Sequence, residues 1–369
     1  MLPKMLTKEL SMTKKEYIIP IFIPFLGCPH DCAFCNQVKI TNYKDKMDPS
    51  KVVSEIEKNL TYFPTNDNIK EIAFFGGSFT GLQKDTMIGY LEIAKDYKEK
   101  GIIDRIRLST RPDYINNSIL DILKEYKVDI IELGIQSLDQ NVLDSNERGH
   151  SVEASIEASK LIKEYGFTLG HQIMPGLFND TYDKTIDTVL KSINIGPDLV
   201  RIYPTLVIKD TKLQILYDDG IYQPLSLDEA VIVSAEAAML YTYAGVNIIR
   251  IGLQPTENIN EGADVVAGPF HPAFRQVVES YIYRKYLEEL VKEKEIKNDI
   301  TIVTNGRNIS LIAGNKKSNK IYFKEKYGID LNFKESYDQY LLYNGKKLNF
   351  SLDDFIKTYV ENKYGGDFN

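Results

Sequence analysis

Short apolar runs alternate along the first part of the chain with segments in which apolar residues recur at helical spacing. The first run, IIPIFIPF at 18–25, is rich in β-branched and aromatic residues, which is typical of a buried strand. Further strands are predicted at 71–77, 105–112, 129–137, 167–177 and 198–208, and helices at 49–63, 84–100, 116–127, 152–166 and 183–193.

Six strands that alternate with helices predict a parallel sheet, because each crossover helix returns the chain to begin the next strand in the same direction. We expect this α/β sheet to curl into a partial (β/α)6 barrel, similar to a TIM barrel. Chemistry in such folds is found on the loops that follow the strands. The residues directly after each predicted strand are therefore the candidates for function.

The pattern changes beyond residue 260. The segment 252–274 is rich in Gly and Pro and predicts a long loop across the barrel mouth, where it would act as a lid or substrate platform. A helix is expected at 277–294, followed by strands that flank turns at NGRN and GNKKSNK in a small α+β C-terminal domain. We therefore expect an N-terminal extension at 1–17, a barrel at 18–260, and a lid loop with a small domain at 261–369.

Composition is that of a globular protein: 43% of the 369 residues are hydrophobic and 26% are charged. The N-terminus lacks the apolar region of a signal peptide, and no apolar run approaches the roughly 20 residues that span a bilayer. We expect a cytoplasmic protein that does not bind a membrane. Thiols are kept reduced there, so clustered cysteines indicate a metal or redox site more than disulfides.

The chain has three cysteines, and all lie in PFLGCPHDCAFCNQ at 24–37. The C-x3-C-x2-C spacing of Cys28, Cys32 and Cys35 lets three thiolates converge on one side of a [4Fe–4S] cluster and leaves the fourth iron open to a small molecule. Zinc bound with His30 is the alternative, although zinc ligands usually come from two separated segments. Unrelated free thiols are a third interpretation.

These cysteines on the first strand's loop, with Gly76-Gly77 after the second strand, resemble the radical S-adenosylmethionine (radical SAM) enzymes. The segments STRPDYI, ELGIQS, RGHSVEAS, MPGL and IYPTLVIKDTKL further resemble the radical SAM domain of the Elongator catalytic subunit family, over about residues 18–260. The resemblance implies that the open iron binds the methionine moiety of SAM. One electron from the cluster would then cleave the sulfonium to methionine and a 5′-deoxyadenosyl radical.

The resemblance also assigns cofactor contacts near the first two strands. Phe34 would lay its ring against the adenine, or else only fill the core of the loop. Gly76 and Gly77 would let the backbone approach the methionine ammonium, which carbonyls of FFGGSFT, including that of Ser78, could accept.

Later strands would complete the pocket. Gln136 and Arg148 fall where relatives similar to oxygen-independent coproporphyrinogen oxidase contact the ribose and the methionine carboxylate, although Arg148 could also be an exposed charge at a helix start. Gln172 stands near the ribose position, and Tyr203 would offer its backbone to the adenine or belong to the core. Ser109 stands where relatives often carry Glu, so the contact of that Glu is not expected here.

The histidines carry less information than the cysteines. His150, His171 and His271 are each expected to be structural more than catalytic. His171 and Gln172 are neighbours on one predicted strand, so their side chains point to opposite faces. We expect Gln172 to face the barrel lumen.

The cysteine count limits the chemistry, because a second cluster or a carrier cysteine would need further thiols. The chain ends at Asn369 without an acetyltransferase segment, so full Elongator function is not expected. Within the radical SAM interpretation, the substrate is either an RNA, with transfer RNA favoured, or a small metabolite under the 254–275 loop. A non-catalytic iron–sulfur or zinc RNA-binding protein is the alternative of another class.

Charge gives a local argument for RNA. The net charge is −7, which disfavours a broad phosphate-binding surface. Residues 305–326 nevertheless hold six basic residues against Glu325 alone, with Tyr322 and Phe323 available for base stacking, unless this segment is simply a solvated face. SAM and a one-electron donor such as flavodoxin or ferredoxin are the other expected partners. The basic residues are Arg307, Lys316, Lys317, Lys320, Lys324 and Lys326.

Overall fold

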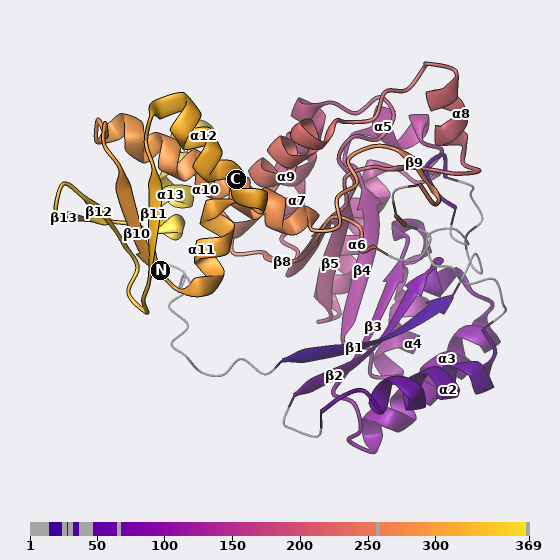
Figure 1. The fold of residues 1–369 in the computed structure, drawn as a ribbon. Coiled ribbons are helices and arrows are strands. Elements are labelled where there is room, and N and C mark those ends of the chain that lie inside the picture. Colours follow the sequence, from indigo (N-terminus) through magenta and orange to yellow (C-terminus); the bar gives the residue numbers. More distant parts are fainter. Residues whose placement is uncertain are drawn as a thin grey trace.

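A computed structural model describes residues 15–23, 28, 32–36, 47–64, 68–255, 259–260 and 262–366. Its main element is a sheet of seven parallel strands in the order β1-β2-β3-β4-β5-β6-β8. Figure 1 shows the sheet curled, with helices along its outer face. The strands are β1 (Glu16–Ile23), β2 (Ile69–Gly76), β3 (Arg105–Thr110), β4 (Ile130–Gln136), β5 (Thr168–Ile173), β6 (Leu199–Ile202) and β8 (Asn247–Ile251).

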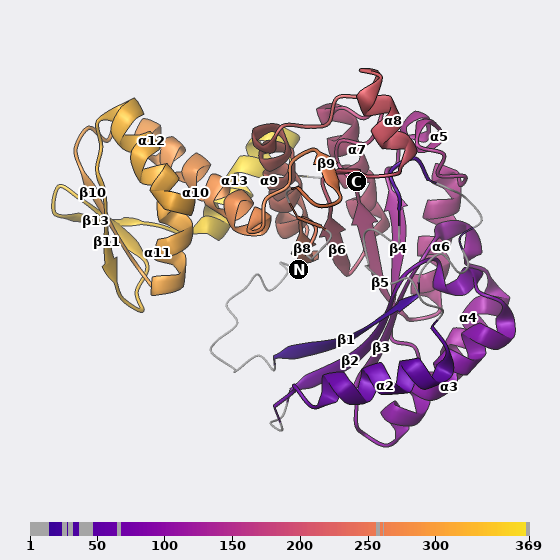
Figure 2. The ribbon, with the colours of Figure 1, turned by 45° about the vertical axis from the view of Figure 1, so that its right-hand side comes forward.

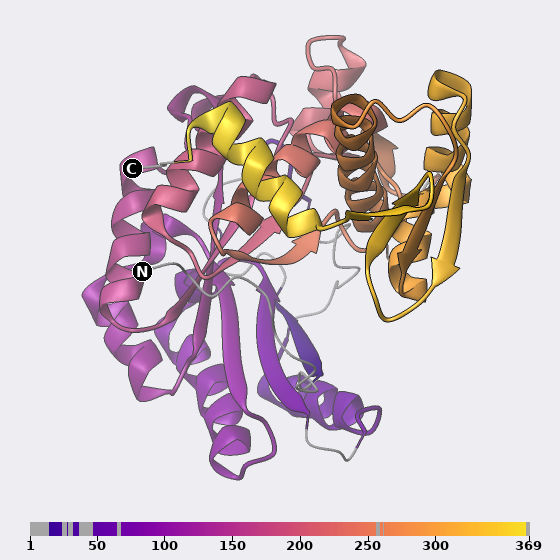
Figure 3. The same cartoon turned by 90° about the vertical axis from the view of Figure 1, so that its left-hand side faces the viewer.

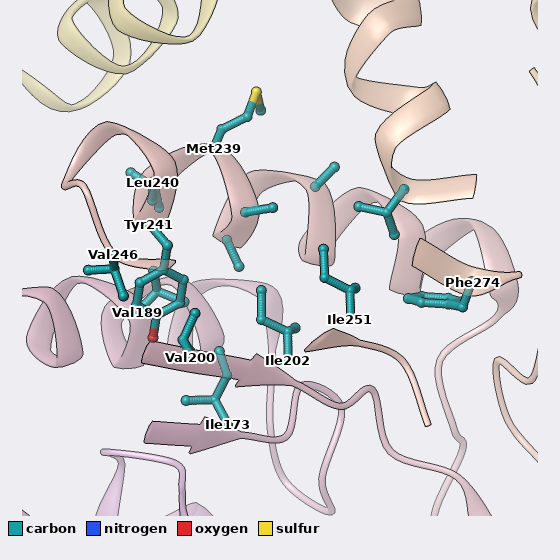
Figure 4. Packing of buried hydrophobic residues seen from close by; sticks show 14 of the residues in the cluster. Ile173, Val189, Val200, Ile202, Met239, Leu240, Tyr241, Val246, Ile251 and Phe274 are labelled. Carbon is teal, nitrogen blue, oxygen red and sulfur yellow. The ribbon is translucent and has the colours of Figure 1, made fainter. Parts of the chain in front are cut away.

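The outer helices alternate with the strands, as predicted as far as β6, and cover one face of the sheet. Apolar strand residues pack under α9 (Leu227–Tyr243), the last of the outer helices, as Figure 4 shows for Ile173, Val200, Ile202 and Ile251. The predicted fold class, an α/β fold with a partial barrel similar to a TIM barrel, is confirmed. The helices are α2 (Pro49–Leu60), α3 (Lys84–Glu99), α4 (Asn117–Glu125), α6 (Val152–Glu164), α7 (Tyr182–Ile195) and α9 (Leu227–Tyr243).

Two details of the barrel differ from the sequence prediction. The predicted strand at 198–208 stops at Ile202, and β7 (Val207–Ile208) instead pairs antiparallel with β9 (Val265–Ala267) from the 252–274 segment. Pro204 has no N–H for the ladder, which accounts for the break. The seventh strand, β8, and the helix α9 before it were not predicted.

Short helices lie at the carboxyl ends of the strands. They are η1 (Phe79–Gly81), η2 (Pro112–Tyr114), α5 (Gln140–Ser145) and α8 (Lys212–Asp218). In Figure 1, α5 and α8 lie at the upper right, at the far side of the barrel from the C-terminal part.

The C-terminal part contains a second sheet, with strand order β11-β10-β12-β13, and its helices (Figure 2). Of the strands predicted around the NGRN and GNKKSNK turns, the strand before NGRN is present as β10 (Ile300–Thr304). The strands predicted after it are wrong, because the chain forms helices there: Asn305 caps the first of them, α11, by accepting the Asn308 N–H at 3.0 Å. The elements are α10 (Phe274–Glu293), β10 (Ile300–Thr304), α11 (Gly306–Ala313), η3 (Asn315–Lys317), α12 (Ser318–Tyr327), β11 (Leu331–Glu335), β12 (Tyr340–Tyr343), β13 (Lys346–Asn349) and α13 (Leu352–Tyr364).

The two parts share one continuous hydrophobic core, which runs from β1 through α9 and α10 to α13. Figure 3 shows α13, the yellow helix, lying between the second sheet and the outer helices of the barrel. Among the helices of the described residues, none is both long and apolar enough to span a bilayer.

Candidate functional site

The cysteine segment lies beyond the carboxyl end of β1 and is fixed by backbone hydrogen bonds. The Ala33 N–H donates to the Asn146 carbonyl at 3.0 Å, and the Leu213 N–H donates to the Ala33 carbonyl at 2.7 Å. The Cys35 N–H donates to the Cys32 carbonyl at 2.9 Å, which closes a tight turn. The ends of α5 and the start of α8 therefore hold this turn from two sides.

Three hydrogen-bond donors point at two of the cysteine sulfurs. The Ser78 N–H lies 3.3 Å from Cys28 Sγ. Arg148 Nη1 lies 3.3 Å and Arg111 Nη1 lies 3.8 Å from Cys32 Sγ. Burial raises the pKa of the Cys28 thiol, whereas the Ser78 N–H and both guanidinium groups act in the opposite direction. Donors directed at sulfur are what a thiolate ligand of an iron–sulfur cluster needs.

A single zinc ion and a [4Fe–4S] cluster differ in the spacing that they require of the cysteine sulfurs. Among the residues that the structure describes, no three Cys, His, Asp or Glu side chains are gathered to hold one metal ion, and His30 lies outside those residues. Around one zinc, thiolate sulfurs stand only about 3.8 Å apart, which follows from tetrahedral bonds of about 2.3 Å. In a [4Fe–4S] cluster each cysteine binds a different iron, so the three cysteine sulfurs stand farther apart than around one zinc ion.

Arg148 is a buried cation without a carboxylate partner among the described residues. Arg148 is 7% exposed, and its Nη2 donates to the Gly134 carbonyl at 2.6 Å. Its buried Nε has no hydrogen-bond partner within the described part of the chain. Burial of an unpaired charge is costly, so this position is suited to an anionic group. The predicted alternative, an exposed charge at a helix start, is wrong.

Gln136 and Gln172 face each other from adjacent strands. Gln172 Nε2 donates to Gln136 Oε1 at 3.1 Å, and the Gln136 backbone is left-handed, with φ of 64°. His171 points away, as predicted from the strand period, because its ring nitrogens bond Ser159 Oγ at 2.9 Å and Ser192 Oγ at 2.8 Å on the outer helices. The two glutamines and Arg148 thus cluster near the ends of β4 and β5.

The glycine segment after β2 closes against its neighbours. Gly76 has φ of 106°, a conformation that favours glycine, and the Gly77 N–H donates to the Ile23 carbonyl at 2.7 Å. Ser78 is buried, and its hydroxyl bonds Thr110 Oγ1 at 2.8 Å, while its N–H points at Cys28. The segment after β2 therefore lies beside Cys28.

Phe34 and Tyr203 are occupied by other contacts in this structure. Phe34 is 8% exposed and packs in an apolar cluster with Val142, Leu177 and Leu213, which is the core-filling role that the sequence left open. The Tyr203 N–H donates to the Ile173 carbonyl at 2.9 Å, and its hydroxyl accepts from Arg201 Nη1 at 3.2 Å.

Sequence reasoning missed a buried ion network across the opposite face of the sheet from the helices. Arg107 donates to both carboxylate oxygens of Glu71, at 2.5 and 3.1 Å, and to Glu132 at 2.6 Å. Arg201 donates to Glu132 at 2.5 and 3.0 Å. Although burial opposes its ionisation, the two arginines hold the pKa of Glu132 below its usual value. The sequence did hold a sign of this network, because β2, β3, β4 and β6 each carry one of these charged residues among apolar ones.

The remaining histidines have structural surroundings. His150 Nδ1 lies 3.2 Å from the Ser151 carbonyl, and burial, with help from Arg148, lowers the pKa of His150 to about 4. His271 Nδ1 accepts the Ala273 N–H at 3.0 Å, and Asn315 Nδ2 lies 3.1 Å from His271 Nε2. The second contact joins the 252–274 segment to the C-terminal part.

The basic segment lies on α11, η3 and α12 in the C-terminal part, where Figure 1 labels the two helices. Two of its lysines are neutralised, since Lys324 pairs with Asp330 at 2.7 Å and Lys326 with Glu288 at 2.8 Å. Lys316 and Lys317 are exposed.

Known proteins resemble this chain in sequence. The family described as "Radical SAM superfamily" matches residues 22–191, and "Radical_SAM C-terminal domain" matches residues 197–284. The "Uncharacterized protein MJ0486" of Methanocaldococcus jannaschii is 31% identical over 230 residues, which cover 58% of this chain and 68% of that protein. The "tRNA uridine(34) acetyltransferase" of the same organism is 32% identical over 127 residues, or 34% of this chain and 24% of that protein.

This chain spans only about a quarter of the length of the tRNA uridine(34) acetyltransferase that it matches. Among solved structures, archaeal Elp3 of Methanocaldococcus infernus with an N-terminal deletion is similar, with a TM-score of 0.58 and 22% identity. The similarity covers 74% of this chain and 64% of that one. At this identity the likeness supports the fold of the barrel.

Proposed function

Because this chain belongs to the radical SAM superfamily, whose enzymes use a [4Fe–4S] cluster and SAM, we propose that Cys28, Cys32 and Cys35 hold that cluster. The observation that carries the proposal is the convergence of Arg148, Arg111 and the Ser78 N–H on two of the cysteine sulfurs. When bound, the cluster supplies the electron that cleaves SAM to methionine and a 5′-deoxyadenosyl radical.

The neighbouring strand ends would bind SAM. The turn at Gly76 and Gly77 brings backbone groups beside the cysteines, which suits the methionine ammonium. The guanidinium of Arg148 suits the methionine carboxylate, because its buried charge lacks a carboxylate among the described residues. The paired amides of Gln136 and Gln172 suit the ribose hydroxyls. The Tyr203 backbone is proposed to contact the adenine, whereas Phe34 keeps the two roles that the sequence left open, its ring against the adenine or core packing.

Anaerobic reconstitution tests the cluster. We expect about four irons per chain with cluster absorption, and loss of both in Cys32→Ala, because only three thiolates are available. One tightly bound zinc per chain in protein purified without oxygen would overturn the assignment.

Calorimetric titration with SAM tests the pocket. Arg148→Ala should weaken SAM binding by about 1.5–3 kcal/mol, the range of a charged hydrogen bond, or about 10- to 150-fold. Arg275→Ala, which removes an exposed arginine paired with Glu279, is the matched control and should leave SAM affinity unchanged. Equal affinities of both variants for SAM would remove Arg148 from the pocket.

For the substrate we propose transfer RNA, with α11, η3 and α12 as the phosphate-contacting surface. The support is the similarity to a protein named tRNA uridine(34) acetyltransferase and the exposed Lys316 and Lys317. The 254–275 segment, whose strand β9 pairs with β7, favours the second candidate, a small metabolite held beneath it.

Salt dependence of transfer RNA binding separates these candidates. Lys316, Lys317 and Lys320 changed together to Gln should lower affinity and reduce the log–log salt slope by about 2–3, because fewer counterions are released. The same change at exposed Lys58, Lys160 and Lys292 should have less effect. Equal binding by both triple variants, or none by the wild type at low salt, would favour the small metabolite.

A further inference from the structure

Arg111 is a second buried arginine beside Cys32, and its guanidinium is held on several sides. The residue is 3% exposed. Its Nε and Nη2 donate to the two carboxylate oxygens of Asp113 at 2.9 and 3.1 Å, and Nη2 also donates to the Arg148 carbonyl at 2.6 Å. The remaining nitrogen, Nη1, points at Cys32 Sγ at 3.8 Å. The fork geometry leaves one direction for each donor.

The local sequence fixes this aim. Arg111 precedes Pro112, which favours the extended backbone observed, with φ of −91° and ψ of 149°. Pro112 then begins η2, which brings Asp113 back under the guanidinium two residues later. The Arg111 N–H donates to Ser78 Oγ at 3.3 Å, so the backbone is tied to the segment that contacts Cys28.

The pair presents its positive end to the sulfur and its negative end to the surface. The Asp113 side chain is 25% exposed, whereas that of Arg111 is 3% exposed. Reduction adds a negative charge to a cluster, and donors on its cysteine sulfurs stabilise the reduced form. The positive charge of Arg111 therefore favours the reduced cluster, whereas the negative charge of Asp113 disfavours it.

We propose that the Arg111–Asp113 pair is a positioning unit that sets the reduction potential of the cluster on Cys32, an inference that rests on the proposed function. Arg111 acts through the Cys32 sulfur, and Asp113 both aims Arg111 and offsets its charge. In the absence of SAM, the electron that reduces the cluster would come from an external one-electron donor and would stay on the iron–sulfur group.

The test is a redox titration of reconstituted protein without SAM, followed by electron paramagnetic resonance. Arg111→Gln should lower the midpoint potential and Asp113→Asn should raise it, each with about a tenfold change in the reduction equilibrium, or 59 mV for one electron. Arg105→Gln is the matched control, since Arg105 begins β3, the strand that Arg111 directly follows, and pairs with Glu16 at 3.2 Å. Its potential should equal that of the wild type.

Opposite shifts in the two variants support the inference, because a merely structural role would give shifts of one sign or none. Shifts of the same sign, or shifts no larger than that of Arg105→Gln, overturn it. If Arg111→Gln takes up no cluster, Asp113→Asn decides: a raised potential supports the inference, and an unchanged or lowered one overturns it. A wild type that takes up no iron overturns the proposed function and this inference together, whereas iron uptake with unmoved potentials overturns only this inference.

Discussion

At the residue scale, Gly134 determines where the Arg148 guanidinium can lie. The Gly134 carbonyl accepts from Arg148 Nη2, and a Cβ at Gly134 would lie 2.9 Å from that nitrogen and 2.8 Å from Gln136 Nε2. Both distances are shorter than real contacts to a Cβ. The absence of a side chain at Gly134 is therefore part of the arrangement beside Cys32.

Gly134→Ala should displace Arg148 and Gln136 and so weaken SAM binding about 10-fold or more in calorimetry. Gly89→Ala is the control, because nothing lies within 4 Å of that Cβ and Gly89 is inside α3. Ala is the better helix former there by roughly 0.5–1 kcal/mol, so we expect equal SAM affinity and a slightly raised melting temperature. Unchanged affinity in Gly134→Ala would show that Arg148 is not needed in its observed position.

His171 gives a pH dependence of stability. Burial lowers its pKa to about 3, and Lys163 acts in the same direction, whereas an unfolded histidine titrates near 6.5. Below pH 6.5 the unfolded state binds a proton that the folded state does not. The contribution of His171 is thus complete above pH 6.5 and is lost as the pH falls towards 3.

Urea denaturation of the cluster-free protein should show this loss. Between pH 7.5 and 5.5 the free energy of unfolding should fall by about 1.4 kcal/mol because of His171. It should fall by a similar amount because of His150, since burial also lowers the pKa of His150, to about 4. His171→Gln should be less stable at pH 7.5 but should lose about half as much on acidification. An identical loss in wild type and variant would contradict the assignment.

At the element scale, the turn between α11 and α12 requires an unusual backbone. Gly314, Lys316 and Lys317 have φ of 83°, 51° and 63°, and left-handed conformations cost non-glycine residues roughly 1–2 kcal/mol. Lys317→Gly should therefore raise the free energy of unfolding by about 0.5–1 kcal/mol in denaturant titrations.

Lys320→Gly is the matched control, because Lys320 lies inside α12, where glycine costs about 1 kcal/mol. The two substitutions should thus change stability with opposite signs. Destabilisation by both would indicate that the Lys317 side chain makes a contact worth more than the relief of strain.

At the scale of the whole molecule, a buried carboxylate joins α13 to α9. Glu236 is 3% exposed and accepts hydrogen bonds from Tyr359 Oη at 2.9 Å, Tyr364 Oη at 2.8 Å and Lys363 Nζ at 2.8 Å. The division of the sequence at residue 260 remains a proposal about domains, because α9, α10 and α13 share the continuous core.

Glu236→Gln should weaken this junction by about 1.5–3 kcal/mol, since three donors lose a charged acceptor. Hydrogen exchange in α13 should become faster, with little change in β1–β6. Lys357→Gln, which breaks the exposed pair of Lys357 with Glu361 at 4.0 Å, should change stability by less than about 0.5 kcal/mol. Equal exchange of α13 in both variants would show that apolar packing alone holds the helix.

The sequence by itself determined what depends on local pattern. Hydrophobic periodicity and turn residues predicted six of the seven barrel strands and the helices α2, α3, α4, α6 and α7, most of them within a few residues. The spacing of Cys28, Cys32 and Cys35 indicated an iron–sulfur site. Strand period alone was enough to place His171 and Gln172 on opposite faces. The same local reasoning failed at 305–326, where capping by Asn305 outweighs the β-branched residues that favoured strands.

Only the tertiary structure decided what depends on distant parts of the chain meeting. Arg111 and Arg148 reach the Cys32 sulfur from 79 and 116 residues away, and the network of Glu71, Arg107, Glu132 and Arg201 joins four strands. Local propensities carry no record of such partners, because an arginine looks the same in sequence whether water or a thiol surrounds it. Burial makes the difference, since a charge removed from water must meet a partner that the fold brings to it.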